Sequence, residues 1–430
     1  MIEKSSMTIS AIPPTVKLIA VLTGIAVPWL VFGRVIMALP LILAVLLLVW
    51  FPERRQYWRA LLGQVRTPIG MMVLVTLALW LPSMVVSPQP LRSMEAWARI
   101  PVFIGLIFFL AAMLSERQEA LALALKALIV TGAIATLFAL FSLTFLPEFL
   151  SFVRSSPSHW GWIDMPYPGF RPDNILKPYA ALTVLMAPVL VWGGWRLGGY
   201  WRILAAVTVI GLFGVVLLTY NRSAIAGLLA ITVVGAGLMM CVRRNLAVNM
   251  AVGVVLFSII LAVLLWQHDT RRSMHVPPIS EGIVVTLPQW LIDYQRQTIW
   301  VHAIDIGMRS PWFGNGINVI NFLPGADLKL PNNNLNVIPA HPHNWLVEVF
   351  AETGALGAFA LLTLVITLCI KLSGDFLKSG NTALLAALLV NVGYWSSGLL
   401  SFSFWSAWWQ VSFLLMMAFC LAGRARLDQD

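Results

Sequence analysis

The sequence contains few charged residues for its length. Aspartate, glutamate, lysine and arginine make up 11% of the 430 residues, whereas hydrophobic residues make up 59%. A typical soluble domain has about 25% charged residues, because its surface has to be covered by groups that water solvates. So little charge excludes a soluble enzyme or binding module, and we expect an integral membrane protein.

Cysteine is also scarce, and its positions exclude two kinds of site. Cys241, Cys369 and Cys420 lie far apart in the sequence, and none belongs to a CxxC pair. They indicate neither a disulfide nor a thiolate metal site. The histidines and acidic residues also lack the spacing of metal ligands, so we predict no metal and no cofactor. A run of interleaved basic and aromatic residues is missing too, so the net charge of +10 does not indicate nucleic-acid binding.

Long apolar runs are abundant. A membrane-spanning helix needs roughly 20 apolar residues. No signal-peptide cleavage pattern separates the first apolar run from the second, so we expect the first run to be retained as a span. We predict an all-α, polytopic membrane protein with about 12 transmembrane helices in a single domain over residues 1–430. The helices are expected near 15–33, 35–51, 68–86, 100–114, 120–146, 178–194, 201–219, 223–241, 246–266, 344–370, 381–400 and 404–423.

Basic residues concentrate in alternate connections, which places both termini in the cytoplasm by the positive-inside rule. This topology puts every histidine and two long loops, 147–177 and 267–343, on the outer, periplasmic side. The larger loop joins the ninth and tenth predicted spans. Apolar residues recur in it at near-helical spacing after Pro288, which predicts an amphipathic helix.

Basic side chains at the outer boundary are candidates for binding an anion. Arg222, in "TYNRSAIAG", lies in a short outer turn against the orientation bias; it either reaches lipid headgroups or belongs to a buried anion site. Arg296, on the predicted amphipathic helix, is either a solvated helix-face residue or a second member of that site. Arg171 and Lys177, in the first outer loop, are either interface anchors or further anion contacts.

The segment "HPHNWLVEVFAETGALG", residues 341–357, combines ionisable groups with an apolar run. His343 lies at or beside the start of the predicted helix, where the positive field of the helix N-terminus disfavours imidazolium. A neutral histidine is suited to act as a general base. The alternative is that His343 caps the helix and His341 makes loop hydrogen bonds. Pro342 keeps His341 extended, so only one imidazole is expected to be catalytic.

Two carboxylates follow within the same helix. Glu348 and Glu352 are four residues apart and share a helix face. Carboxylates in a membrane helix are costly unless they are paired or hydrated, so we expect them to line a polar interior or to meet an arginine. Gly354 and Gly357 are expected to let a neighbouring helix approach closely.

Three stretches resemble the bacterial O-antigen ligases, within the wider group of O-antigen ligases and polymerases. "TYNRSAIAG" is similar to a Ser-Arg-Gly/Ala turn, with Asn221 in place of serine, and "RQTIWVHAIDIGMRSPWFGNG" resembles an arginine, a helix and a Pro-x-x-Gly-x-Gly ending. "HNWLVEVFAETGALG" resembles a histidine followed by a polar residue and GxxG, although Ala358 and Phe359 replace the threonines frequent in ligases. The matching residues are Arg222, Arg296, Pro311, Gly314, Gly316, His343, Asn344, Gly354 and Gly357.

The resemblance implies a metal-independent, inverting glycosyl transfer at the periplasmic face of the bacterial inner membrane. The donor would be O-antigen polysaccharide on undecaprenyl diphosphate, and the acceptor would be the lipid A-core oligosaccharide. Arg222 and Arg296 would bind the diphosphate, with Arg171 and Lys177 nearby. His343 would be the base, with His341, Asn344 and Glu348 in support.

Two other functions remain open at this point. An O-antigen polymerase would use the same donor with another lipid-linked glycan as acceptor. A transporter of lipid-linked glycans would place its charged groups near the membrane midplane, on broken helices. The gathering of candidate groups at one predicted face favours an enzyme.

Overall fold

The computed structural model describes residues 12–51, 53–150, 172–242, 245–272, 287–288, 290–329 and 336–424. Within these ranges the chain is helical and forms no strand beyond one isolated bridge between Lys329 and Asn336. The elements are α1 (Pro14–Ala26), η1 (Pro28–Phe32), α2 (Arg34–Val49), α3 (Arg54–Val65), α4 (Pro68–Val85), α5 (Pro90–Glu116), α6 (Gln118–Thr144), α8 (Pro172–Ala181), α9 (Thr183–Leu197), α10 (Tyr200–Leu218), α11 (Arg222–Val242), α12 (Leu246–Arg272), α13 (Tyr294–Gly307), η2 (Ile320–Phe322), α14 (Trp345–Ser379), α15 (Thr382–Gly398) and α16 (Ala407–Ala422).

The helices confirm an all-α, polytopic membrane protein. Each of the predicted spans contains a helix, and seven helices in the described ranges are long and apolar enough to cross a membrane. Counting two bent pairs as single spans raises this number to nine. The sequence predicted more spans, because it treated α1, α15 and α16 as full-length although these helices have only 13, 17 and 16 residues.

Several predicted spans are interrupted, and prolines account for part of this. The expected helix 15–33 ends at Ala26 and continues as the 3₁₀ turn η1, which begins at Pro28. The expected helix 178–194 is divided into α8 and α9, which meet at an angle of 48°. Pro178 and Pro188 lie inside these two helices, where a proline lacks the N–H that bonds to the preceding turn.

The basic connection after the second predicted span is helical over most of its length as α3. Two helices begin later than predicted. The amphipathic helix begins at Tyr294 and not after Pro288, since Asp293 caps its N-terminus. The last span begins at Ala407, which leaves residues 399–406 as a loop. This 399–406 loop contributes to the site described below.

Helix α14 contains a backbone break that the sequence did not predict. Gly354 has φ 72° and ψ −179°, so its peptide leaves the helix between two helical segments. The open turn receives the segment Pro311–Gly316: the N–H of Ala355 donates to the carbonyl of Pro311 at 2.7 Å, and the N–H of Gly316 donates to the carbonyl of Glu352 at 3.0 Å. The two glycine motifs therefore interlock through their backbones, and the neighbour that Gly354 admits is a loop.

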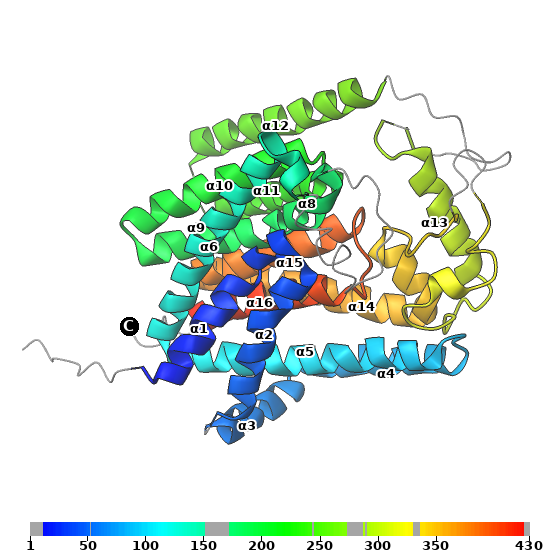
Figure 1. Cartoon of the computed structure of the whole chain (residues 1–430), viewed down its shortest axis with the longest axis horizontal. Coiled ribbons are helices and arrows are strands. Elements are labelled where there is room, and N and C mark those ends of the chain that lie inside the picture. Colours follow the sequence, from blue (N-terminus) through cyan, green and yellow to red (C-terminus); the bar gives the residue numbers. More distant parts are fainter. Residues whose placement is uncertain are drawn as a thin grey trace, which may run out of the picture.

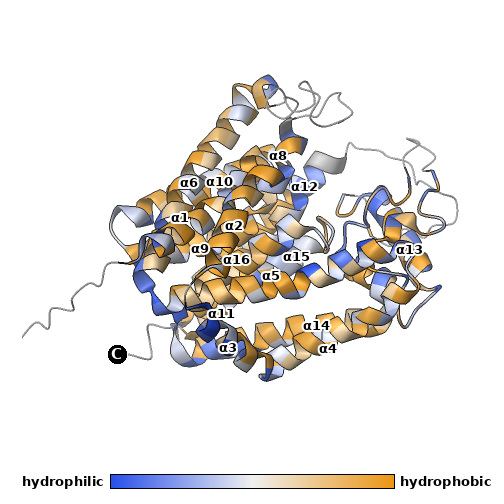
Figure 2. Cartoon of the chain, turned by 60° about the horizontal axis from the view of Figure 1, so that its bottom comes forward, coloured by the Kyte–Doolittle hydropathy of each residue, from blue (hydrophilic) through white to orange (hydrophobic). Residues whose placement is uncertain are grey.

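The bundle has two different ends. Helix α13 and the loops that follow it lie at one end, and the first described residues and the C-terminal end of α16 lie at the other (Figure 1). Apolar residues dominate the long helices, whereas hydrophilic residues are frequent around α13 and α3 (Figure 2). The end that carries α13 also carries the N-terminus of α14, because α13 and α14 pack together.

Candidate functional site

The histidine loop, residues His341–Asn344, is held in a defined conformation. His343 has φ 56°, a left-handed conformation that is uncommon for residues other than glycine. The side chain of Asn344 then caps α14 by accepting from the N–H groups of Leu346 and Val347. From α13, Trp300 Nε1 donates to the carbonyl of Pro342 at 2.9 Å. These contacts place the two imidazoles side by side, with ring centroids 4.2 Å apart.

The hydrogen bond of His343 determines which of its nitrogens can accept a proton. Nδ1 lies 3.1 Å from the carbonyl oxygen of Ser401, in the 399–406 loop. A carbonyl oxygen can only accept, so Nδ1 carries the hydrogen and donates it. The lone pair of the neutral ring is therefore on Nε2. This is the arrangement that a histidine general base requires.

Both histidines are neutral at pH 7. Burial, followed by the positive charge of Arg296, lowers the pKa of His343 below its ordinary value of 6.5. Burial and the neighbouring His343 lower the pKa of His341 to about 3. The sequence predicted a neutral His343 from the field of the helix N-terminus, whereas burial is the main cause in the structure.

Asp293 joins the two predicted arginines into one cluster. Its Oδ2 accepts from Arg222 Nη2 at 2.8 Å, and its Oδ1 accepts from the backbone N–H of Arg296 at 2.9 Å. Burial alone would raise the pKa of Asp293, but the charges of Arg296 and Arg222 lower it, so the carboxylate is ionised. One carboxylate thus lies between two guanidinium groups, and the cluster of these three side chains retains a positive charge.

Each arginine of this cluster has unused hydrogen-bonding capacity. Arg222 Nη1 and Arg296 Nη1 are buried and have no hydrogen-bond partner within the described residues. A buried N–H group of a charged side chain is costly when it has no hydrogen-bond partner. Two such groups in one cluster therefore indicate a binding site for a ligand that accepts hydrogen bonds. Because Arg296 also acts on the charge of both histidines, the cationic cluster and the imidazoles share one site.

The other predicted anion contacts are placed less centrally. Lys177, on α8, donates from Nζ to Asn174 Oδ1 at 2.6 Å, and its carbonyl accepts from Asn221 Nδ2 at 2.8 Å. It therefore lies beside the turn that leads into Arg222. Asn221 Oδ1 accepts from the N–H of Ala224, which is the capping role that a serine also performs. Arg171 lies outside the described residues.

The two glutamates bind neither arginine, contrary to one of the two expectations. Glu348 is buried and accepts from Ser403 Oγ at 2.6 Å and from the N–H of Phe404 at 2.7 Å. Glu352 is buried too, and it accepts from the successive backbone N–H groups of 318–320 at 2.7 to 2.8 Å. Both carboxylates fasten loops to the start of α14. Glu348 fastens the 399–406 loop, whose Ser401 carbonyl orients His343.

Two residues of the site were missed in the sequence. Asp293 was missed because an aspartate before a helix is common as an N-cap and does not by itself indicate a binding site. Arg34 begins α2, stacks its guanidinium 5.5 Å from the ring centroid of Trp408, and acts on the charge of His341. A usable signal was present for Arg34, because it stands in the short outer connection after the first predicted span. Arg222 was identified from the same violation of the orientation bias.

Comparisons with known proteins find a match to the part of the chain that carries most of the residues of this site. Residues 207–362 match the family described as O-Antigen ligase, and this range includes Arg222, Arg296, His343 and both glycine motifs. The proteins named "Putative polysaccharide ligase" in Rickettsia conorii and Rickettsia typhi are similar: each is 24% identical, over 170 and 172 residues respectively, or 39% of this chain. These matches span 37% and 38% of the length of the two relatives. The segment 207–362 of this chain is therefore similar to the O-antigen ligase family, and the similarity to the two relatives covers a comparable share of the chain.

Proposed function

We propose that this protein is an O-antigen ligase. It transfers O-antigen polysaccharide from undecaprenyl diphosphate to the lipid A-core oligosaccharide, at the periplasmic leaflet of the bacterial inner membrane, with both termini in the cytoplasm. The observation that carries this proposal is the pair of buried, incompletely bonded guanidinium groups of Arg222 and Arg296 beside a neutral His343. That combination suits an anionic leaving group and a hydroxyl nucleophile.

The arginines act on the donor. A diphosphate ester has several oxygens that accept charge-assisted hydrogen bonds, and a guanidinium can bind two of them at once. Arg222 and Arg296 stabilise the negative charge that grows on the diphosphate as its bond to the sugar breaks. Lys177, and Arg171 on the preceding segment, add further positive charge for the donor.

His343 acts on the acceptor. The hydroxyl oxygen attacks the anomeric carbon from the face opposite the diphosphate, which inverts the configuration there. As the new C–O bond forms, the old C–O bond breaks and its electron pair leaves with the diphosphate. The hydroxyl proton passes to His343 Nε2, while Nδ1–H remains bonded to Ser401. The charged groups on the chain thus accomplish the transfer without a metal.

The decisive experiment combines the purified protein with lipid-linked O-polysaccharide and lipid A-core. A product that carries both the polysaccharide and the lipid A-core, absent when either substrate is omitted, supports ligation. Lengthening of the lipid-linked polysaccharide in the absence of core identifies a polymerase. Export of the donor across a sealed membrane without covalent change identifies a transporter.

Arg222→Lys and Arg222→Gln are expected to weaken donor binding. Removal of charge-assisted hydrogen bonds costs roughly 1.5–3 kcal/mol, or about one to two orders of magnitude in affinity. Lysine should rescue little, because a point charge cannot replace the planar fork. Titration with polyprenyl diphosphate measures the effect. Arg309→Gln is the matched control, since Arg309 is exposed and bonds the carbonyl of Pro324 away from the cluster. Wild-type affinity in both Arg222 variants would exclude this arginine from the donor site.

The pH dependence of transfer is expected to follow the lowered pKa of His343. Since burial and Arg296 favour the neutral ring, the midpoint of the fall in rate should lie below the ordinary histidine pKa of 6.5. The rate falls there because protonation removes the lone pair on Nε2. Initial rates on both sides of this value, with protein integrity checked at each pH, give the midpoint. A midpoint above 6.5 would contradict a base in this environment.

A further inference from the structure

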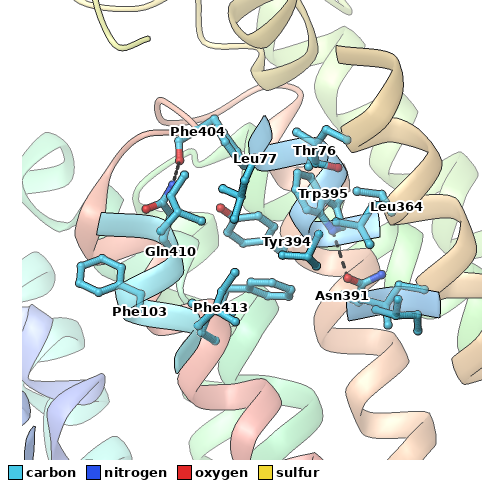
Figure 3. Close-up of a pocket in the computed structure, with 18 of the residues that line it drawn as sticks. Thr76, Leu77, Phe103, Leu364, Asn391, Tyr394, Trp395, Phe404, Gln410 and Phe413 are labelled. Carbon is cyan, nitrogen blue, oxygen red and sulfur yellow. Dashed lines mark hydrogen bonds between the residues drawn. The ribbon is translucent and has the colours of Figure 1, made fainter. Parts of the chain in front are cut away.

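An apolar cavity lies among the five helices α4, α5, α14, α15 and α16. Helix α14 packs on α4, α16 packs on α5, and α15 packs on both α14 and α16. These helices enclose a volume of about 250 Å³. Side chains from all five point into it, as Figure 3 shows for Leu77, Phe103, Leu364, Tyr394 and Phe413.

The two amide side chains in the cavity wall, Asn391 and Gln410, are hydrogen-bonded to the protein. Asn391 Oδ1 accepts from Trp395 Nε1 at 3.0 Å, and Gln410 Nε2 donates to the carbonyl of Phe404 at 2.8 Å (Figure 3). Gln410 Oε1 is buried and has no hydrogen-bond partner within the described residues. A carbonyl oxygen cannot bind a phosphate, so the cavity suits a hydrocarbon chain.

A cluster of packed aromatic side chains lies between the histidine loop and the cavity. Trp345, two residues after His343, packs on Trp395 with ring centroids 4.8 Å apart. Trp395 and Phe404 line the cavity, and their rings are 6.0 Å apart. The histidine loop and the cavity are therefore joined by the contacts of Trp345, Trp395 and Phe404.

We propose that this cavity receives part of the single isoprenoid chain of the diphosphate donor. The inference rests on the proposed function for the identity of the headgroup. An apolar cavity of about 150 Å³ holds one benzene molecule, so 250 Å³ holds a segment of one chain and not several chains. The acceptor lipid A carries several acyl chains that remain together in the bilayer. The donor has one chain, and its alkene groups meet the aromatic faces of Tyr394, Trp395 and Phe413.

The test uses the full-length protein in lipid nanodiscs and a probe that needs no transfer. The probe is a polyprenyl diphosphate with a photoreactive diazirine in its chain, and mass spectrometry maps the labelled peptides. Labels are expected on the cavity-lining parts of α14 and α15. A phosphatidylglycerol with the same diazirine in an acyl chain is the second probe. It is expected to label lipid-facing positions and not the cavity.

Variants that fill the cavity give the matched comparison. Leu361 is 4% exposed and Leu364 is partly exposed, and both line the cavity, whereas Ile366 on the same helix is 50% exposed. Leu364→Trp should reduce cavity labelling about tenfold, the loss expected when about two methylene groups can no longer be buried. Leu361→Trp should do the same if it folds, and Ile366→Trp should label as the wild type does.

The outcomes separate this inference from the proposed function. Cavity labelling by the polyprenyl probe that Leu364→Trp removes supports the inference, even where the ligation assay fails. Equal labelling of the cavity by the phospholipid probe would show a general lipid site and overturn the inference. Labelling confined to the outer surface, in a protein that ligates, would overturn it as well.

Discussion

His343→Asn is expected to lower the rate of transfer by a factor of about 10² to 10⁴, which is the usual contribution of a general base. Asparagine tolerates the left-handed backbone at this position, so the loop should keep its shape. Its amide cannot take the proton of the attacking hydroxyl. The rate of formation of ligated polysaccharide, measured with donor and acceptor at saturating concentrations, gives the effect.

His302→Gln is the control for this substitution. His302 lies on α13, and its Nδ1 bonds the carbonyl of Thr298 within the same helix at 3.0 Å. Its replacement should leave the rate close to the wild-type value. A His343→Asn protein that is monodisperse and transfers at the wild-type rate would remove His343 as the base. In that case His341 could not take its place, because its pKa of about 3 makes it a weak base.

Gly354→Ala is expected to destabilise the protein by about 3 kcal/mol or more, through backbone strain and overlap. The added Cβ would overlap the backbone carbonyl of Trp312, and φ is +72° at this position. The N-terminal part of α14 and Pro311–Gly316 could then no longer interlock, so Glu352 and the histidine loop would lose their support. The thermal unfolding midpoint and the yield of monodisperse protein report the effect.

The same helix offers the control. A Cβ at Gly374 would meet no atom within 4 Å, and this residue lies in the regular part of α14. Gly374→Ala should leave the stability unchanged or raise it by roughly 0.5–1 kcal/mol, because alanine loses less conformational entropy than glycine when the helix folds. Equal unfolding midpoints for the two variants would show that the break at Gly354 is not required.

Hydropathy was sufficient to locate the helices, because a span of the required length must be apolar over its whole sequence. It could not show where a helix is interrupted. The division between α8 and α9 and the break at Gly354 depend on backbone angles and on the segments that pack there. Both ends of the 399–406 loop were assigned to the neighbouring spans for the same reason, since these residues are apolar enough to enter a span.

For the site, local sequence singled out Arg222 and His343 as candidates, because each places a polar group at a membrane boundary or a helix start. Arg296 became a candidate through the resemblance to the O-antigen ligases, since by itself it could equally be a solvated residue on a helix face. Which groups they contact is a property of the tertiary structure. Asp293 bonds Arg222 from a distant segment, and Glu348 binds Ser403 where an arginine had been considered. Hydrogen bonds between distant segments depend on where the chain brings their backbones.

The amino-acid sequence alone thus determined that the chain is an all-α membrane protein and which polar residues lie near the ends of its apolar runs, since the balance between apolar and charged side chains is a local property. The folded bundle decided which nitrogen of His343 is free, which arginine nitrogens lack a partner among the described residues, and that an apolar cavity lies between α4, α5, α14, α15 and α16. Burial and close packing arise only when distant helices meet, and both determine how a side chain ionises and what it can bind.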